Sequence, residues 1–397
     1  MGARSTATGA VSGSAAAETL KSLAPHLPAF GITRVGLLTG LDVLGIPVAF
    51  ATRPNSRALS VTQGKALCAD EARLGAVMEA FEQAFAERSE TLTVRVAALP
   101  DVVERAVDLT GLKRAARLSG QEIAWARATS LVSGAEQLVP LELVGLDLRG
   151  NLSSGFSATP VSGLGLGAGM SWEAAATHAL LEIVEHNATT ATDIFGFLPG
   201  FARPVRVCPG DDTALDDIVA RIERAGLCYQ LYDLTSPGGL PVIGATLDCP
   251  DLVPGWMQFA GYACRFSPEH AAEAALLEAI QSRLTVIAGA RDDLEPQSYC
   301  GGARCLGDTP HGGPLRALPR AHAQLRHAAP RDKLAQALEC AIALGAQDVL
   351  VATLGEIPGL VSVVRVIASN LEAMGYNAPT ALGRRTLEAL FAKAGTR

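Results

Sequence analysis

The sequence predicts a mixed fold of the α/β or α+β class, because helical and strand-like patterns alternate along the whole chain. Clear helical patterns cover residues 69–88, 172–190 and 268–288, and the last of these has a proline in its first turn. The chain has 397 residues, of which 49% are hydrophobic, so it can bury a large core. The pattern does not predict which strands pair.

The elements follow one another in a regular order along the chain. Residues 1–30 are small and polar, and we expect a flexible lead-in with one short helix around 15–22, followed by a main domain over 31–397. In the first half, strands are expected at 33–38, 47–52, 58–61 and 122–130, a helical piece at 99–109, and a Gly/Ser/Pro-rich loop at 150–169. In the second half, helices are expected at 213–226, 331–344 and 384–394, strands at 229–233, 242–248, 256–265, 348–353 and 361–366, and a loop at 291–328.

Charge and cysteine content exclude several classes of protein. The net charge is −7 with 18% charged residues and no basic run, which argues against a nucleic-acid-binding protein. No apolar stretch reaches about 18 residues, so we expect no membrane span and a cytoplasmic protein. Eight cysteines are scattered without a C-x-x-C pair, which predicts neither a disulfide framework nor a structural metal.

Three of the helices share one spaced pattern of alanines and acids. The pattern is Ala, Ala four residues later, Glu three residues later, then Glu or Gln three residues later. It comprises Ala72, Ala76, Glu79 and Glu82; Ala175, Ala179, Glu182 and Glu185; and Ala271, Ala275, Glu278 and Gln281. At about 100° per residue, the four positions fall within roughly 120° of one helix face. The alanines allow close packing against a neighbour, and the acids lie just beyond that contact.

Large apolar residues flank these acids, so we expect the carboxylates to be partly buried. A buried unpaired carboxylate is unfavourable unless it is protonated, paired or bound to a metal. Clustered carboxylates suit Mg²⁺, which is usually shared with nucleotide phosphates. A solvated helix edge is the simpler interpretation of any single pair, but three repeats favour the functional one.

A glycine-rich segment precedes the second of these helices. Ser162, Gly163, Gly165, Gly167 and Gly169 permit a close backbone approach to a ligand, and Ser171 after them is suited to cap the helix, whose N-terminus favours anions. The segment is not a Walker A loop, because the nearest Gly64-Lys65 pair lacks the other residues of that motif.

Basic residues stand beside the acid-bearing helices in the sequence. Arg57 and Lys65 precede the first helix, and Arg283 and Arg291 belong to or follow the third. Such groups can pair with phosphates, and surface arginines with acidic neighbours are the alternative.

Taken together, these segments resemble the YcaO family over residues 30–395. The resemblance is carried by 39–48, 53–57, Gly64-Lys65, Glu79 and Glu82, 162–169, Glu182 and Glu185, 278–283 and 291–293. It implies mixed sheets packed against helices around a central ATP and Mg²⁺ site. It also implies an enzyme that activates a peptide backbone amide: a nucleophile adds to the amide carbonyl, the resulting oxyanion attacks the γ-phosphate of ATP, and phosphate leaves with the amide oxygen. A Cys, Ser or Thr nucleophile gives an azoline, and external sulfide gives a thioamide, usually with a TfuA partner.

The resemblance also implies roles for individual residues. Glu182, Glu185 and Arg283 are expected to be catalytic, and Glu79, Glu82, Glu182, Glu185 and Glu278 to bind Mg²⁺. The expected nucleotide contacts are Arg57, Lys65, Ser162, Gly163, Gly165, Gly167, Gly169, Gln281 and Arg291.

The chain departs from the family pattern at a few positions. His186-Asn187 stands where Arg-Asp is frequent, Leu164 stands where Asn is usual, and the end of the sequence lacks a Pro-x-Pro-x-Pro tail. The first hypothesis is therefore that the protein forms a thioamide in a precursor peptide, together with a TfuA-like or leader-peptide-binding partner. We expect the protein to be a homodimer. Azoline formation and a catalytically weak scaffolding subunit remain the alternatives.

Overall fold

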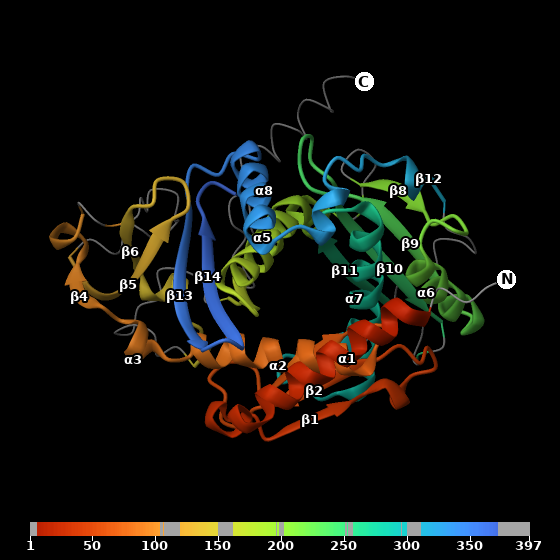
Figure 1. Cartoon of the computed structure of the whole chain (residues 1–397), viewed down its shortest axis with the longest axis horizontal. Coiled ribbons are helices and arrows are strands. Elements are labelled where there is room, and N and C mark those ends of the chain that lie inside the picture. The colour runs from red at the N-terminus through yellow and green to blue at the C-terminus, as the bar shows by residue number, and fades with distance from the viewer. Residues whose placement is uncertain are drawn as a thin grey trace.

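The computed structural model describes residues 6–103, 106, 120–149, 162–195, 197, 202–250, 252, 257–294, 296–299 and 311–371. Within these residues, three sheets lie around the middle of the molecule (Figure 1). Eight α-helices are also described: α1 (Thr6–Leu23), α2 (Ala69–Ala86), α3 (Ser89–Leu92), α4 (Leu141–Val144), α5 (Trp172–Phe195), α6 (Thr213–Arg224), α7 (Pro268–Ala288) and α8 (Pro330–Ala343). The mixed fold predicted from the alternating patterns is confirmed.

The first sheet is antiparallel, in the order β1-β2-β3, with β1 (Arg34–Leu37), β2 (Val48–Thr52) and β3 (Val61–Lys65). The second has the order β4-β5-β13-β14-β7, with β6 also paired to β5. Its strands are β4 (Arg95–Ala98), β5 (Glu122–Ser130), β6 (Glu136–Pro140), β7 (Leu166–Gly169), β13 (Val349–Ile357) and β14 (Val361–Ala368). The third has the order β11-β10-β9-β8-β12, with β8 (Arg203–Arg206), β9 (Cys228–Asp233), β10 (Val242–Cys249), β11 (Met257–Cys264) and β12 (Gly313–Pro314).

Each sheet contributes one strand that packs against one of the acid-bearing helices, through a glycine facing two alanines. On β3, a Cβ added to Gly64 would lie 2.1 Å from the Ala72 carbonyl oxygen of α2. On β11, the corresponding distance from Gly261 to the Ala275 carbonyl oxygen of α7 is 2.3 Å. Gly167 of β7 makes the equivalent approach to α5. The spaced alanines therefore place each helix almost directly on the backbone of its strand.

Local signals explain why α7 has the predicted bounds. The Ser267 hydroxyl accepts a hydrogen bond from the His270 amide at 3.3 Å, and Pro268 occupies the first turn. The helix ends at Gly289, which adopts φ +58°. α2 and α5 begin at the predicted residues, and their ends differ by two and five residues from those expected.

Several elements differ from the sequence-based expectation. The glycine-rich loop expected to run to residue 169 contains β7, because alternate glycines fit a strand packed on a helix. The strand expected at 58–61 begins only at Val61. α1 is longer than the expected short helix, and its last residue, Leu23, is fully buried against the α2 core. The division of the chain at residue 30 stays a prediction. The expected helix 384–394 and residues 104–105 and 107–109 of the expected helical piece lie outside the described residues. So do residues 295 and 300–310 of the expected loop 291–328, whose described parts contain three short 3₁₀ helices and β12.

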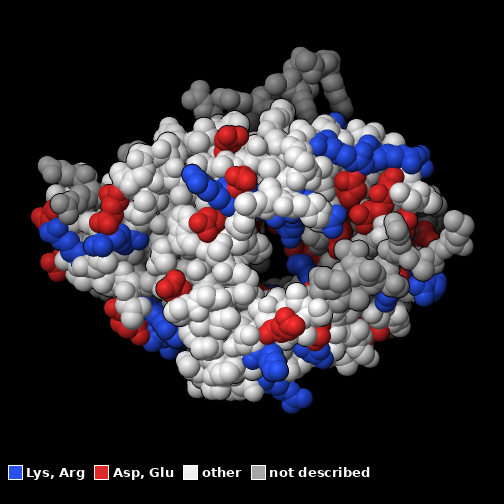
Figure 2. Space-filling view, viewed as in Figure 1, with Lys and Arg blue, Asp and Glu red and all other residues white. Residues whose placement is uncertain are grey.

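Two further observations concern the described residues as a whole. Within the ranges given above, no helix combines the length and the apolar character that a bilayer crossing requires. α2, α5 and α7 surround the centre of the view in Figure 1, and Figure 2 shows that this face is hollowed there, with acidic and basic side chains on the wall.

Candidate active site

The six acid and amide side chains of α2, α5 and α7 connect the three sheets in a ring. In α2 and α5, the first acid of the pattern bonds to the strand segment on which its helix packs. Glu79 accepts a hydrogen bond from the Gln63 amide at 3.0 Å, and Glu182 accepts one from the Gly165 amide at 3.0 Å. The second acid of α2 bonds to the sheet that α5 covers: Glu82 accepts a hydrogen bond from the Ala168 amide of β7 at 2.7 Å.

The remaining contacts close the ring. Glu185 of α5 accepts a hydrogen bond from the Cys264 amide of β11 at 3.0 Å. On α7, Glu278 pairs with Lys65 of β3 at 2.9 Å, and the Gln281 amide donates to Gln63 of β3 at 3.5 Å. The structure therefore brings together all six side chains that the sequence pattern singled out, and Lys65 with them.

Burial and mutual repulsion shift the proton affinity of these acids. Burial, and then the charge of Glu79, raise the pKa of Glu82 to about 8 against the Ala168 hydrogen bond. Burial, and then the charge of Glu82, raise the pKa of Glu182 to about 8. Burial also raises the pKa of Glu79, and that of Glu185 well above its usual value, where Glu278 adds to the effect. The shifts of Glu79, Glu182 and Glu185 each include repulsion from an acid of another helix, so acids of the three helices lie near one another.

This donor set fits Mg²⁺ bound together with a nucleotide. The carboxylates are half-buried and supply oxygen ligands, and a divalent cation would relieve the repulsion between them. Within the described part of the chain, no three His, Cys, Asp or Glu side chains converge closely enough to hold one metal ion by themselves. Phosphate oxygens and water would therefore complete the coordination, as Mg²⁺ requires.

Most of the glycines before α5 serve packing, which was not expected. A Cβ at Gly167 would lie 2.4 Å from the Ala175 carbonyl oxygen, and one at Gly169 would lie 2.5 Å from the Ala175 amide. Gly165 adopts φ +78° and approaches the Val366 carbonyl oxygen. Gly163 differs, because it is exposed and has nothing within 4 Å of its added Cβ. Of the four, Gly163 leaves the most space for a ligand.

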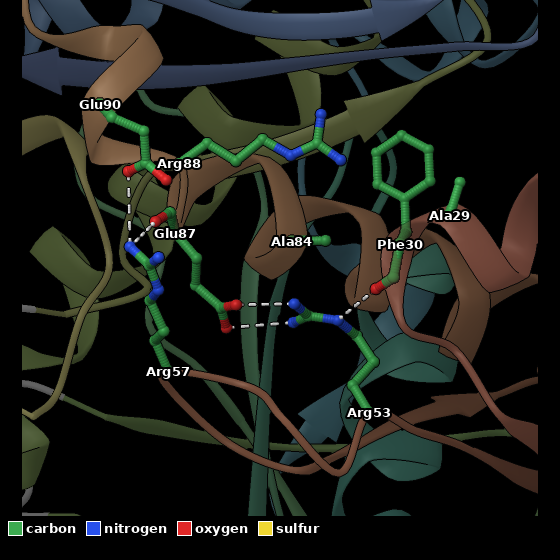
Figure 3. A pocket seen from close by; sticks show the side chains of 8 residues that line it. All are labelled: Ala29, Phe30, Arg53, Arg57, Ala84, Glu87, Arg88 and Glu90. Carbon is green, nitrogen blue, oxygen red and sulfur yellow. Dashed lines mark hydrogen bonds and ion pairs between the residues drawn. The ribbon is translucent and has the colours of Figure 1, made fainter.

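Three of the expected basic groups have protein partners in the structure. The Arg283 guanidinium lies 2.9 Å from Asp42, in an ion pair whose side chains are 2% and 1% exposed. Arg57 lies at the end of α2, where it donates to the Glu87 carbonyl oxygen at 2.9 Å beside a pocket of about 190 Å³ (Figure 3). None of the six ring side chains lines that pocket. Arg291 pairs with Asp293 at 2.5 Å, and its charge also acts on Glu79. Phosphate binding by these arginines stays a prediction.

The positions that depart from the family pattern have plain structural settings. His186 and Asn187 are half-buried on α5, directly after Glu185. Leu164 is partly buried and packs against the core that α5 and α8 share.

The structure adds residues that the sequence pattern did not indicate. Gln63 is 4% exposed and lies between Glu79 and Gln281, and its side-chain Nε2 has no hydrogen-bond partner. His178 lies one turn before Glu182, and loss of water around its imidazole, together with the charges of Arg265 and Lys65, lowers its pKa to about 4. Arg365 of β14 holds the segment before β7. His178 could have been found from the sequence, because it lies on the same helix face as Glu182. Gln63 and Arg365 could not, because their contacts are with residues far away in the sequence.

The fold and the ring of carboxylates are those expected of a protein that binds Mg²⁺ and a nucleotide. Residues 63–372 match the family described as YcaO cyclodehydratase, which binds ATP and Mg²⁺. The chain belongs to the YcaO family, and the resemblance seen in its sequence is confirmed.

Relatives in sequence extend over most of the chain. An uncharacterized protein of the tfuA 3' region of Rhizobium leguminosarum bv. trifolii is 37% identical over 378 residues, which cover 90% of this chain and 87% of that protein. An uncharacterized protein of Methanothermobacter thermautotrophicus is 32% identical over 287 residues, covering 70% of this chain and 71% of that one.

Solved structures share the fold. YcaO from Methanopyrus kandleri, bound with AMPPCP and Mg²⁺, matches with a TM-score of 0.67 and 22% identity, covering 90% of this chain and 91% of that one. A heterocyclase in complex with substrate and cofactor matches with a TM-score of 0.65 and 16% identity, over 86% of this chain and 50% of that one. The E. coli microcin synthetase complex with its pro-microcin bound contains a chain that matches with a TM-score of 0.57 and 14% identity, over 84% of this chain and 87% of that one.

Proposed function

We propose that this protein uses ATP to activate a backbone amide of a peptide, and that a thioamide is the product. The observation that carries the proposal is the ring of six acid and amide side chains, which joins three sheets and fits Mg²⁺ with nucleotide phosphates. Family membership supports the use of ATP. The relative from the tfuA 3' region supports a TfuA-like partner, and with it sulfide as the nucleophile.

The residues of this chain would contribute positioning and charge. Phosphoryl transfer depends mainly on placing the reacting groups and neutralising developing charge. Bound Mg²⁺ would supply the charge that the phosphates need, held by the carboxylates of Glu79, Glu82, Glu182, Glu185 and Glu278. Lys65 pairs with Glu278 at 2.9 Å, and its ammonium would orient the third helix.

Product mass tests the proposal against azoline formation. The protein, Mg²⁺, ATP, a sulfide donor, a precursor peptide and a TfuA-like partner from the same genome are combined, and the peptide is analysed by mass spectrometry. A thioamide replaces oxygen by sulfur, whereas an azoline loses water. Loss of water without sulfide would replace our proposal with a cyclodehydratase.

A matched variant tests whether this chain itself performs the reaction. Glu182→Gln keeps the shape and the hydrogen bond from Gly165 but removes the charge. We expect it to abolish peptide-dependent phosphate release. If wild type and Glu182→Gln release phosphate at the same background rate, a scaffolding role replaces the enzymatic one.

The homodimer stays part of the proposal, and light scattering of the purified protein measures it.

A further inference from the structure

Arg365 of β14 is a buried cation whose hydrogen bonds end on backbone carbonyls. It is 3% exposed. Its Nε donates to the Leu143 carbonyl oxygen at 2.9 Å, its Nη1 to that of Leu164 at 2.7 Å and its Nη2 to that of Ser162 at 2.6 Å. Burying a guanidinium is costly, so a side chain held in this way has a definite task.

The bonds made by Arg365 are part of a continuous pattern over residues 162–165. The Gly163 carbonyl oxygen accepts from the Leu166 amide at 3.0 Å, and the Gly165 carbonyl oxygen accepts from the Val366 amide at 2.8 Å. With the two carbonyls bound by Arg365, four consecutive carbonyl oxygens are therefore occupied by the protein.

This pattern decides which groups the segment can offer to a ligand. With four of its carbonyl oxygens bound inside the protein, the segment does not offer those carbonyls to a ligand, and Gly163 within it is exposed. Backbone amides without competing carbonyls suit an anion. The Gly165 amide also donates to Glu182 at 3.0 Å, so the same segment fixes the direction of a ring carboxylate.

We propose that Arg365 is a positioning residue for the nucleotide: it draws the carbonyls of Ser162 and Leu164 inward, so that the segment can face phosphate oxygens and hold Glu182 in place. The inference rests on the proposed function, because it takes the ligand to be ATP. Lysine cannot replace arginine here, since one ammonium lacks the planar fork that reaches three carbonyls.

The test compares Arg365→Lys with Arg53→Lys. Arg53 is a matched control, because it is 6% exposed and also donates to a backbone carbonyl, that of Phe30 at 3.1 Å, but lies at the end of α2 with Glu87. Binding of a non-hydrolysable ATP analogue with Mg²⁺ is measured by calorimetry, beside thermal unfolding and the KM and kcat for ATP.

We expect Arg365→Lys to weaken analogue binding about tenfold or more and to raise KM for ATP more than it lowers kcat, whereas Arg53→Lys leaves both unchanged. Analogue binding by Arg365→Lys at the wild-type level overturns the inference, as does an equal loss in Arg53→Lys. If wild type binds no analogue, the proposed function fails as well. If wild type binds but forms no thioamide, only the proposed product fails.

A second pair of variants covers the case in which Arg365→Lys does not fold. Gly165→Ala disturbs the same segment from its other end, because its φ is +78° and a Cβ would lie 2.3 Å from the Val366 carbonyl oxygen. Gly210→Ala imposes the same kind of strain at φ +84°, with open space around it. We expect Gly165→Ala, and not Gly210→Ala, to weaken analogue binding and to speed hydrogen exchange at 162–169. Equal binding by the two variants overturns the inference.

Discussion

Glu82 and Glu182 each have a pKa of about 8 in the folded protein, so burying them lowers the stability of the ligand-free protein at neutral pH. A folded-state pKa above the usual 4.5 means that the folded protein must hold protons that the unfolded chain would release. The associated stability is therefore present below about pH 4.5 and is lost as the pH rises towards 8.

Glu182→Gln should remove this penalty. In Mg²⁺-free protein above pH 8 we expect the variant to exceed wild type in unfolding free energy by on the order of 1–3 kcal/mol, and to match it near pH 4. Chemical denaturation at a series of pH values measures the difference. Glu223→Gln, at an exposed position on α6, is the control and should show no such trend. A constant difference at every pH would contradict the assignment.

The glycines before α5 differ in what a methyl group would meet. Gly167→Ala forces a Cβ to within 2.4 Å of the Ala175 carbonyl oxygen, so we expect a loss of about 1–3 kcal/mol or more in unfolding stability. Gly163→Ala meets open space and should leave stability within about 0.5 kcal/mol of wild type. Urea denaturation of both variants measures this, and equal losses would show that the two glycines share one role.

At the scale of elements, the buried pair of Asp42 and Arg283 joins the short 3₁₀ helix Thr39–Leu41 to α7. Removing one partner leaves an uncompensated buried charge, so Asp42→Asn should lower the unfolding free energy by about 3–5 kcal/mol. Replacing both residues, as Asp42→Leu with Arg283→Met, should cost less than Asp42→Asn alone. Thermal or urea unfolding of the set measures the coupling, and additive losses would argue against a specific pair.

The helices were predictable because their signals are local. α7 has the predicted bounds because Pro268 and the apolar period define it without reference to the rest of the chain. The six ring side chains could be listed for the same reason, since one spacing repeats in three helices. β7 was not predictable, because glycine-rich sequence is typical of loops and only its contact with α5 makes it a strand. The partner of Arg283 lies 241 residues away in the sequence, beyond the reach of any local pattern.

At the scale of the molecule, the three strand–helix units should stabilise one another when the ligand binds. Mg²⁺ bound with the nucleotide would offset the charge of acids from all three helices, whereas nucleotide alone would add negative charge beside them. We expect the non-hydrolysable ATP analogue with Mg²⁺ to raise the melting temperature, by an amount equivalent to about 2.7 kcal/mol at one hundred times its Kd, and either component alone to do much less. Differential scanning fluorimetry measures this. An equal rise with nucleotide alone would place the ligand away from the acids.

The contact between Lys65 and Glu278 joins residues 213 positions apart. During synthesis, α2 and then α5 are made before α7, so their acids are present in the nascent chain before the side chains of α7. A nascent chain that ends before α7 lacks Glu278 and Gln281 and therefore the complete ring, and non-local closure of this kind is slow. If the ring binds ATP as proposed, a chain that ends before α7 should not bind it.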